Sequence, residues 1–278
     1  DDDSEEGEEG TRPPTREFVP GMGPESLRAA GIAQLPVARE ASAALRKLVA
    51  WIQQPDCWQL LLNAESGDEL RLPPCWTDTP DTDKPWPRWR LQSSKGSGNR
   101  LLWLYAGDEA AMEPFETLAA AVGPAGVEAA ARPLDAPSNS FPPVQLCSAC
   151  LVILRSPGAQ DSQVFVHRDW DLSVPALPER SAFTVLLPLL MPEGSAGLEV
   201  YDQEKSFQGV VAYDANSEEA VAFDNRQPHR TQPGRSPTRI LASLSFAPTD
   251  PELWAQTECV FRGQTPHFYR SPLCHPAC

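Results

Sequence analysis

The sequence has no apolar run long enough to cross a membrane. A membrane-spanning helix needs roughly 20 consecutive apolar residues, whereas the longest apolar run here, which begins near Ala182, is interrupted at Met191-Pro192. The chain also shows no secretory or transit signal and does not begin with Met. We therefore expect a soluble protein, either processed after removal of a targeting segment or a fragment, and its compartment stays open.

Basic residues are too few to favour a polyanionic partner. The chain of 278 residues has 23 Lys and Arg against 38 Asp and Glu, which gives a formal net charge of -15. Such a surface repels nucleic acid, so no nucleic-acid partner is expected. Part of the acidic excess lies in residues 1–9, within a tail at residues 1–23 that we expect to be disordered. This acidic tail is a candidate site for a protein partner.

The cysteines give no strong disulfide or zinc signature. Their number is seven, so at least one thiol stays unpaired within the chain. Cys147 and Cys150 have C-x-x-C spacing, but they lie at the start of an apolar β-like run, which favours two strand cysteines over a zinc or redox site. A looser C-terminal group could form a disulfide or bind zinc; its members are Cys259, His267, Cys274, His275 and Cys278.

The N-terminal half mixes helices, strands and loops. Apolar residues at three- and four-residue spacing predict a helix over Val37–Gln53, which Pro55 ends. The other expected elements are a short strand at Trp58–Asn63, a turn at 66–68, a loop at 73–98 containing Trp76, Trp86 and Trp89, a strand at Leu101–Tyr105 and a helix at Asp108–Val122 with Asp108 as its N-cap.

From Val144 onward, short apolar runs alternate with turn residues. The runs are Val144–Leu154, Gln163–Val166, Ala182–Leu189, Leu198–Tyr201, Gly209–Tyr213, Ala220–Phe223 and Arg239–Phe246. Many short strands at this spacing predict a β-sandwich or barrel. We therefore expect a mainly β protein with flanking helices (α+β). The expected parts are the tail at 1–23, a mixed extension at 24–143 that packs on the core, a β core at 144–250 and a Cys-containing extension at 251–278.

One histidine-containing motif has the residue types of a metal site. The chain has only four histidines, and His167 follows an apolar stretch two residues before Asp169. In a strand these two side chains point to the same face. With His229 downstream, they form the ligand set of a non-haem Fe(II) centre with open positions. Simpler alternatives are hydrogen-bonded histidines, Asp169 as a cap or turn residue, and Asp171 as the carboxylate ligand.

These residues carry a family resemblance. The stretch from about Leu146 to Pro248 resembles the double-stranded β-helix (jelly-roll) core of the Fe(II)- and 2-oxoglutarate-dependent dioxygenases, with a strand pattern most similar to the prolyl 4-hydroxylase-like branch. The matching features are the H-x-D motif at 167–169, the stretch before the distal histidine at 220–230, and Arg239 as the basic residue further on. The strand Phe183–Leu189 and the turn at Gly197–Val200 also match.

The resemblance implies a mechanism and its cofactors. His167, Asp169 and His229 would bind Fe(II), with 2-oxoglutarate and O2 in the open positions and ascorbate as a further cofactor. The activity would be the hydroxylation of a C–H bond in a protein, peptide or small-molecule substrate. Because a guanidinium binds a carboxylate in a fixed bidentate geometry, Arg239 is the candidate for the co-substrate's distal carboxylate. Alternation along a strand places Ser243 on the same face, and Arg235 and Arg230 are alternatives.

Two positions depart from the family pattern. Ser156 stands where many members have a Tyr after the Arg of the strand before H-x-D, and Leu241 stands where many have a Ser. Two other functions therefore stay open beside the dioxygenase: a non-catalytic jelly-roll scaffold or assembly subunit that retains the ligand residues, and a cupin-like metalloprotein that does not use 2-oxoglutarate.

Overall fold

The protein is built mainly from antiparallel strands. The computed structural model describes residues 31–72, 86–93, 100–105, 112–122, 143–155, 166–169, 182–192, 197–213, 218–231 and 238–264. The strands are β1 (Ile32–Pro36), β2 (Glu69–Arg71), β3 (Arg88–Ser93), β4 (Arg100–Leu104), β5 (Val144–Arg155), β6 (Phe183–Leu190), β7 (Leu198–Tyr201), β8 (Phe207–Val211), β9 (Glu219–Asp224), β10 (His229–Thr231) and β11 (Thr238–Pro248). The helices are α2 (Arg39–Ile52), α3 (Pro55–Asn63), α5 (Pro251–Gln264) and one at residues 112–122.

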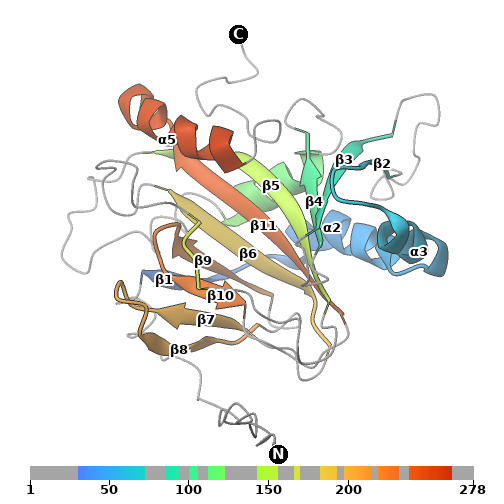
Figure 1. Ribbon diagram of the computed structural model, residues 1–278, viewed down its shortest axis with the longest axis horizontal. Coiled ribbons are helices and arrows are strands. Elements are labelled where there is room, and N and C mark those ends of the chain that lie inside the picture. Colours follow the sequence, from blue (N-terminus) through green and yellow to red (C-terminus); the bar gives the residue numbers. More distant parts are fainter. Residues whose placement is uncertain are drawn as a thin grey trace, which may run out of the picture.

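The strands form two sheets that face each other. The larger has the order β1-β9-β6-β11-β5-β4-β3-β2, and the smaller has the order β10-β7-β8 (Figure 1). From β6 onward the chain passes back and forth between the sheets: β6 belongs to the large sheet, β7 and β8 to the small one, β9 to the large one, β10 to the small one and β11 to the large one. This is the double-stranded β-helix, so the expected jelly-roll core and the mainly β fold class are confirmed. Strands β3 and β4, which precede residue 144, extend the same large sheet beyond β5.

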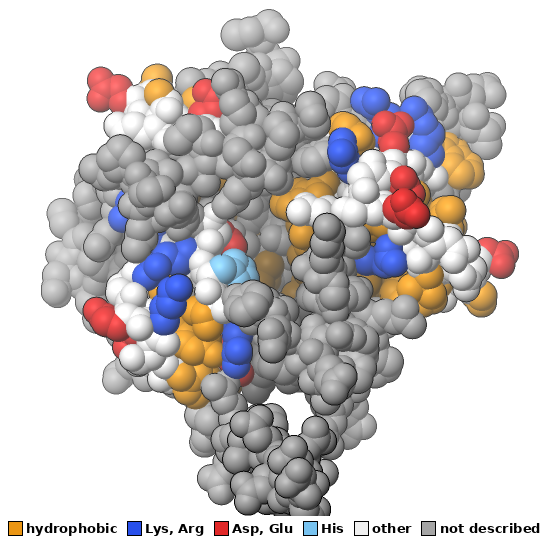
Figure 2. All heavy atoms as spheres, in the orientation of Figure 1, with side chains coloured by type: hydrophobic (Ala, Val, Ile, Leu, Met, Phe, Trp, Pro, Cys, Tyr) orange, Lys and Arg blue, Asp and Glu red, His pale blue; other side chains and the backbone are white. Residues whose placement is uncertain are grey.

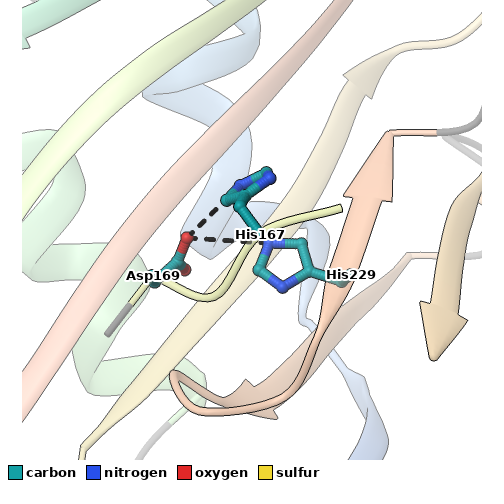
Figure 3. A group of neighbouring side chains, drawn as sticks. All are labelled: His167, Asp169 and His229. Atoms are coloured by element: carbon teal, nitrogen blue, oxygen red, sulfur yellow. Dashed lines mark ion pairs between the residues drawn. The ribbon is translucent and has the colours of Figure 1, made fainter. Parts of the chain in front are cut away.

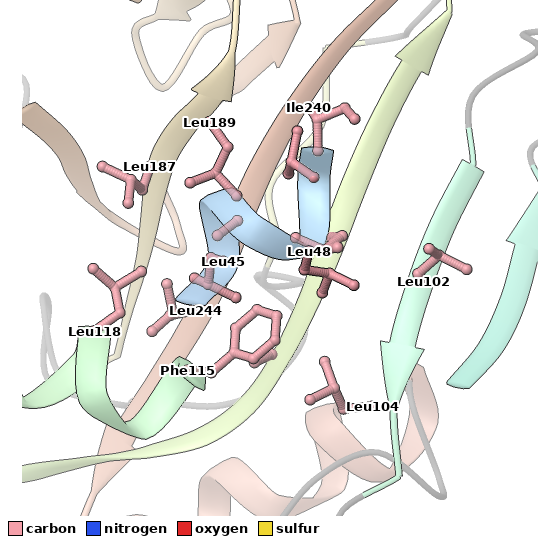
Figure 4. Packing of buried hydrophobic residues seen from close by; sticks show 14 of the residues in the cluster. Leu45, Leu48, Leu102, Leu104, Phe115, Leu118, Leu187, Leu189, Ile240 and Leu244 are labelled. Atoms are coloured by element: carbon pink, nitrogen blue, oxygen red, sulfur yellow. The ribbon is translucent and has the colours of Figure 1, made fainter. Parts of the chain in front are cut away.

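The two faces of the large sheet bury different sets of residues. One face packs on α2 and the helix at 112–122, where Leu45, Leu48, Phe115 and Leu118 meet side chains of β4, β6 and β11 (Figure 4). The other face packs on the small sheet through a second apolar cluster: Ile32, Leu186, Leu198, Val200, Val211, Tyr213, Val221, Phe223 and Leu241. We call the space on this second side the interior of the jelly roll. The smaller set of apolar residues there leaves room for polar side chains.

A glycine fixes the entry into the small sheet. A Cβ added to Gly197 would lie 2.0 Å from the carbonyl oxygen of Val211, so only glycine allows β7 to approach β8 at this point.

Most of the predicted elements are confirmed within small shifts of their bounds, but two are wrong. Helix α2 and the strand at Leu101–Tyr105 are present. The short strand expected at Trp58–Asn63 is instead helix α3, which begins with Pro55 at its first turn. Its buried residues Cys57 and Leu61 are four apart, which is the spacing of a helix face. A short apolar run does not distinguish the two structures by itself.

The loop expected at residues 73–98 also needs correction. Residues 88–93 form β3, which pairs with β2 and β4, and Trp89 is fully buried while Trp86 is 43% exposed. Strand β1 and helix α5 were not expected from the sequence. Asp108, Trp76 and most of the run Gln163–Val166 lie outside the described residues. In the part of the chain that the structure describes, no helix is both long and apolar enough to cross a membrane.

Candidate metal centre

Backbone pairing brings the two expected histidine ligands together. His167 and His229 form an isolated antiparallel bridge in which each backbone N–H donates to the other residue's carbonyl, at 3.0 and 2.9 Å. Residues directly opposite each other in an antiparallel pair project to the same face. Their imidazole rings accordingly lie with centroids 4.5 Å apart. The bridge extends the small sheet past β10, so both rings face the interior of the jelly roll.

Asp169 completes a cluster of three possible metal ligands. Its Oδ1 lies 3.8 Å from Nε2 of His167 and 3.6 Å from Nε2 of His229 (Figure 3). One ligand atom from each residue lies within 4.8 Å of the other two. His167 and Asp169 are close because the H-x-D spacing puts both side chains on one side of the chain. The structure thus brings together all three residues predicted as metal ligands.

The cluster is open on one side and closed on the other. The side chain of His229 is 6% exposed, whereas Asp169 is 29% and His167 is 47% exposed. A histidine side chain is visible at the surface, with basic side chains next to it (Figure 2). A metal held here would therefore be reachable from solvent on the His167 side.

A backbone carbonyl sets the protonation of His229. Its Nδ1 lies 2.8 Å from the carbonyl oxygen of Gln227, which can only accept, so Nδ1 carries the proton. Burial lowers the pKa of His229, an effect that the Asp169 carboxylate opposes and the neighbouring His167 reinforces. A neutral ring with a protonated Nδ1 leaves the lone pair on Nε2, the atom that faces Asp169. This is the outer hydrogen bond that metal-binding histidines commonly make.

Thr184 on β6 orients the carboxylate. Its hydroxyl donates to Oδ2 of Asp169 at 2.8 Å, which leaves Oδ1 directed at the two histidines. The same hydroxyl lies 2.7 Å from the side-chain amide of the buried Asn225. A hydroxyl has one proton to donate, so the amide must present its NH2 group to Thr184. Asn225 and Thr184 together hold Asp169 in place.

A buried cation lies elsewhere in the interior. Arg239 on β11 is 4% exposed, and Leu241, two residues further on, belongs to the interior apolar cluster, so the alternation along β11 predicted for this strand is present. Burial lowers the pKa of Arg239, and the nearby Tyr213 opposes that shift. Burial raises the pKa of Tyr213 well above its ordinary range, against the effect of the Arg239 charge, and the Asp169 charge raises it further.

Ser243 is placed differently from Arg239. It lies opposite Cys150 in the pairing of β11 with β5, and its side chain hydrogen-bonds the Cys150 thiol. Burial raises the pKa of Cys150 to about 12, and that of Cys147 is raised as well. Both cysteines are buried residues of β5 outside any disulfide, so the interpretation of the C-x-x-C pair as strand cysteines is confirmed.

The alternative candidates for the roles of Arg239 and Asp169 either point away from the interior or lie outside the described residues. Arg230 projects away from the interior, because it follows His229 directly and its Nε donates to the buried Glu199, which also accepts from Tyr201. Asp171, Ser156 and Arg235 lie outside the described residues, as do the side chains of the C-terminal cysteine and histidine group. Leu241 is buried in the interior apolar cluster, so no hydroxyl is present at that position.

Sequence reasoning missed Thr184 and Tyr213, as well as the roles of Asn225 and Gln227. Thr184 gave no signal, because a threonine at the start of an apolar run is an ordinary strand residue. Tyr213 did give one: it lies two residues after Val211 in a predicted strand, and Val211 is an interior residue, so alternation would have placed Tyr213 on the interior side as well.

Known proteins resemble the chain only distantly. No protein-family model and no curated protein matches it. Among solved structures, AviO1 from Streptomyces viridochromogenes Tue57 is 16% identical, with 82% of this chain and 94% of that chain covered and a TM-score of 0.43. A Pseudomonas putida prolyl-4-hydroxylase is 14% identical, with 80% and 96% covered and a TM-score of 0.39. The non-heme alpha-ketoglutarate-dependent epimerase SnoN is 13% identical, with 81% and 82% covered and a TM-score of 0.46. Function must therefore be argued from the residues of this chain.

Proposed function

We propose that the protein is an Fe(II)- and 2-oxoglutarate-dependent dioxygenase that hydroxylates a C–H bond of a protein, peptide or small-molecule substrate. The observation that supports this most is the convergence of His167, Asp169 and His229 at the open end of a jelly roll that also buries Arg239. Three ligands of this kind leave coordination positions for a co-substrate and O2, whereas a structural zinc site fills all four of its positions with protein ligands.

The donor set fits iron. Nε2 of the neutral His229 and Oδ1 of Asp169 face each other, and Nε2 of His167 approaches the same carboxylate oxygen from the exposed side. A metal ion between them would replace ion pairs that depend on protonated histidine. The hydrogen bond that His229 donates to the Gln227 carbonyl and the one that Asp169 accepts from Thr184 both favour the metal-binding forms.

Each residue has a separate role in the proposed reaction. His167, Asp169 and His229 hold the metal, and Thr184 with Asn225 keeps the carboxylate in position. Arg239 binds the distal carboxylate of 2-oxoglutarate, where burial of the guanidinium strengthens its attraction for an anion. Bound iron supplies the activation of O2, coupled to the decarboxylation of 2-oxoglutarate to succinate and CO2. The exposed side of His167 is where the substrate would enter.

The test is turnover together with direct metal binding. The purified protein should bind one equivalent of Fe(II) under anaerobic conditions and convert 2-oxoglutarate to succinate in air. The double variant His167→Ala/His229→Ala should lose both, with iron affinity reduced at least about 100-fold, because two of three ligands are gone. The matched control removes the other two of the four histidines, as His267→Ala/His275→Ala, and should retain wild-type iron affinity.

Other outcomes would replace the proposal. Unchanged iron affinity in the first double variant would mean that the metal is bound elsewhere. A well-folded protein that binds no iron and forms no succinate would favour a non-catalytic scaffold. Iron binding with activity that survives Arg239→Ala would favour a cupin-like enzyme that does not use 2-oxoglutarate.

A further inference from the structure

The interior of the jelly roll contains a hydroxyl group that the fold itself does not use. Tyr213 is 9% exposed, and its hydroxyl oxygen is fully buried with no hydrogen-bond partner among the residues that the structure describes. Buried polar groups nearly always have a partner, so one without a partner needs an explanation, such as a ligand or an ordered water. Because the tyrosine is an interior residue, that partner would have to lie inside the jelly roll.

The charges around Tyr213 identify the kind of partner. The hydroxyl is near enough to Arg239 and to Asp169 that both charges act on it. Arg239 comes from β11 of the large sheet, while Tyr213 lies two residues beyond β8 of the small sheet. The two side chains therefore approach the same interior space from opposite sheets. A buried guanidinium beside a neutral hydroxyl donor suits a carboxylate, which accepts hydrogen bonds from both.

We propose that Tyr213 donates a hydrogen bond to the distal carboxylate of 2-oxoglutarate and so fixes the co-substrate jointly with Arg239. This rests on the proposed function and assigns a positioning residue that the motifs did not. It also accounts for Leu241, which has no hydroxyl, since a donor reaches the interior from the small sheet instead. Ser243 is less suited to the role because its hydroxyl already contacts the Cys150 thiol.

The test compares co-substrate binding in two single-atom variants. Tyr213→Phe removes only the interior hydroxyl. Tyr201→Phe is the control, since its hydroxyl donates to Glu199 on the opposite face of β7. With each protein loaded with Fe(II) under anaerobic conditions, calorimetry should show the Kd for 2-oxoglutarate raised roughly 10- to 100-fold in Tyr213→Phe, as expected for one hydrogen bond to a charged group. The control should keep the wild-type Kd, and iron affinity should be the same in all three.

A second ligand separates positioning from a merely structural role. Pyruvate has the 2-oxo acid group of 2-oxoglutarate but no distal carboxylate, so wild type and Tyr213→Phe should bind it equally. The ligand-free Tyr213→Phe protein should unfold at the same temperature as wild type or a higher one, because the variant removes an unpartnered buried group. In turnover, KM for 2-oxoglutarate should rise while kcat changes less than about threefold.

The outcomes separate the two proposals. Wild-type 2-oxoglutarate affinity in Tyr213→Phe would overturn the role of Tyr213 while leaving the dioxygenase proposal in place. Equal losses of pyruvate and 2-oxoglutarate binding would also overturn it, as a general disturbance of the site. If the wild-type protein itself binds Fe(II) but not 2-oxoglutarate, the proposed function fails and this inference fails with it.

Discussion

The two faces of β11 carry different kinds of side chains. Ile240, Ala242 and Leu244 are fully buried against the helices, on the face that holds the largest apolar cluster. Arg239 and Ser243 alternate with them and face the interior, on the side of the proposed metal ligands. One strand thus presents apolar side chains to the helices on one side and polar side chains to the interior on the other. The pleat makes this possible, because consecutive side chains of a strand are on opposite faces.

The neighbouring strands β6 and β5 show the same difference between their two faces. On β6, Val185 and Leu187 belong to the helix-facing cluster while Thr184 orients Asp169. On β5, Ala149 and Leu151 belong to that cluster while Cys150 contacts Ser243. The helix-facing cluster buries apolar side chains and so contributes the free energy of burial to the fold. Substitutions on the two sides should therefore have separable effects, and three of them test this.

The largest effect is expected on the helix-facing side. Leu244→Ala removes a fully buried side chain and should lower the free energy of unfolding by about 2–5 kcal/mol, through lost burial and a residual cavity. Urea unfolding measures the loss. Ser243→Ala, one residue away on the interior face, should change stability by less than about 1 kcal/mol. The folded fraction of Leu244→Ala should bind Fe(II) with wild-type affinity; weaker binding would show that the two faces are coupled.

An intermediate effect is expected from the hydrogen bond to the metal ligand. Thr184→Val keeps the shape of the side chain but removes the hydroxyl that donates to Asp169. Fe(II) affinity should fall roughly 10- to 100-fold, as is usual when the partner of a metal ligand is lost. Anaerobic titration of the metal measures it. Val185→Ala, the adjacent helix-facing substitution, is the control and should reduce stability without reducing Fe(II) affinity. Lower Fe(II) affinity in Val185→Ala but not in Thr184→Val would contradict the proposed difference between the two faces of β6.

The effect that is smallest near neutral pH, and grows only in alkaline solution, is a difference in stability. Burial holds the pKa of Cys150 at about 12, above the ordinary value of 9.0. Between these values the folded protein keeps a proton that the unfolded chain releases, so the contribution of Cys150 to stability is complete below pH 9.0 and is lost as the pH rises towards 12. The loss is at most about 1.4 kcal/mol per pH unit. Unfolding measured across this window should show a shallower decline for Cys150→Ala than for wild type; parallel declines would mean that the thiol ionises in the folded protein.

The strongest sequence patterns gave the most accurate structural predictions. Helix α2 follows from regularly spaced apolar residues, and β5, β6, β7 and β11 follow from apolar runs bounded by turn residues. The prediction failed at α3 because six residues with a few apolar side chains satisfy a strand and a helix equally well. Strand β1 was missed because Pro36 and the short length give it little strand character outside its pairing with β9.

Within the candidate site, the three proposed ligands could be predicted from the sequence, but their hydrogen-bond partners could not. The order of His167, Asp169 and His229 along the chain was enough to predict that they converge, since the H-x-D spacing and the later histidine belong to one fold pattern. The roles of Thr184, Asn225 and Gln227 could not be predicted in this way. Each acts through a hydrogen bond to a residue that becomes its neighbour only when strands and turns distant in sequence are assembled.

The sequence by itself determined the mainly β fold, the alternation of faces along β11 and the residue types of the metal centre, because each depends on short-range spacing. Only the tertiary structure decided that Tyr213 and Arg239 approach each other from opposite sheets and that Arg230 does not face the interior. Those relations depend on how the small sheet is placed against the large one. That placement results from burying apolar side chains between the sheets, to which Val211, Leu186, Phe223 and Leu241 all contribute from different strands.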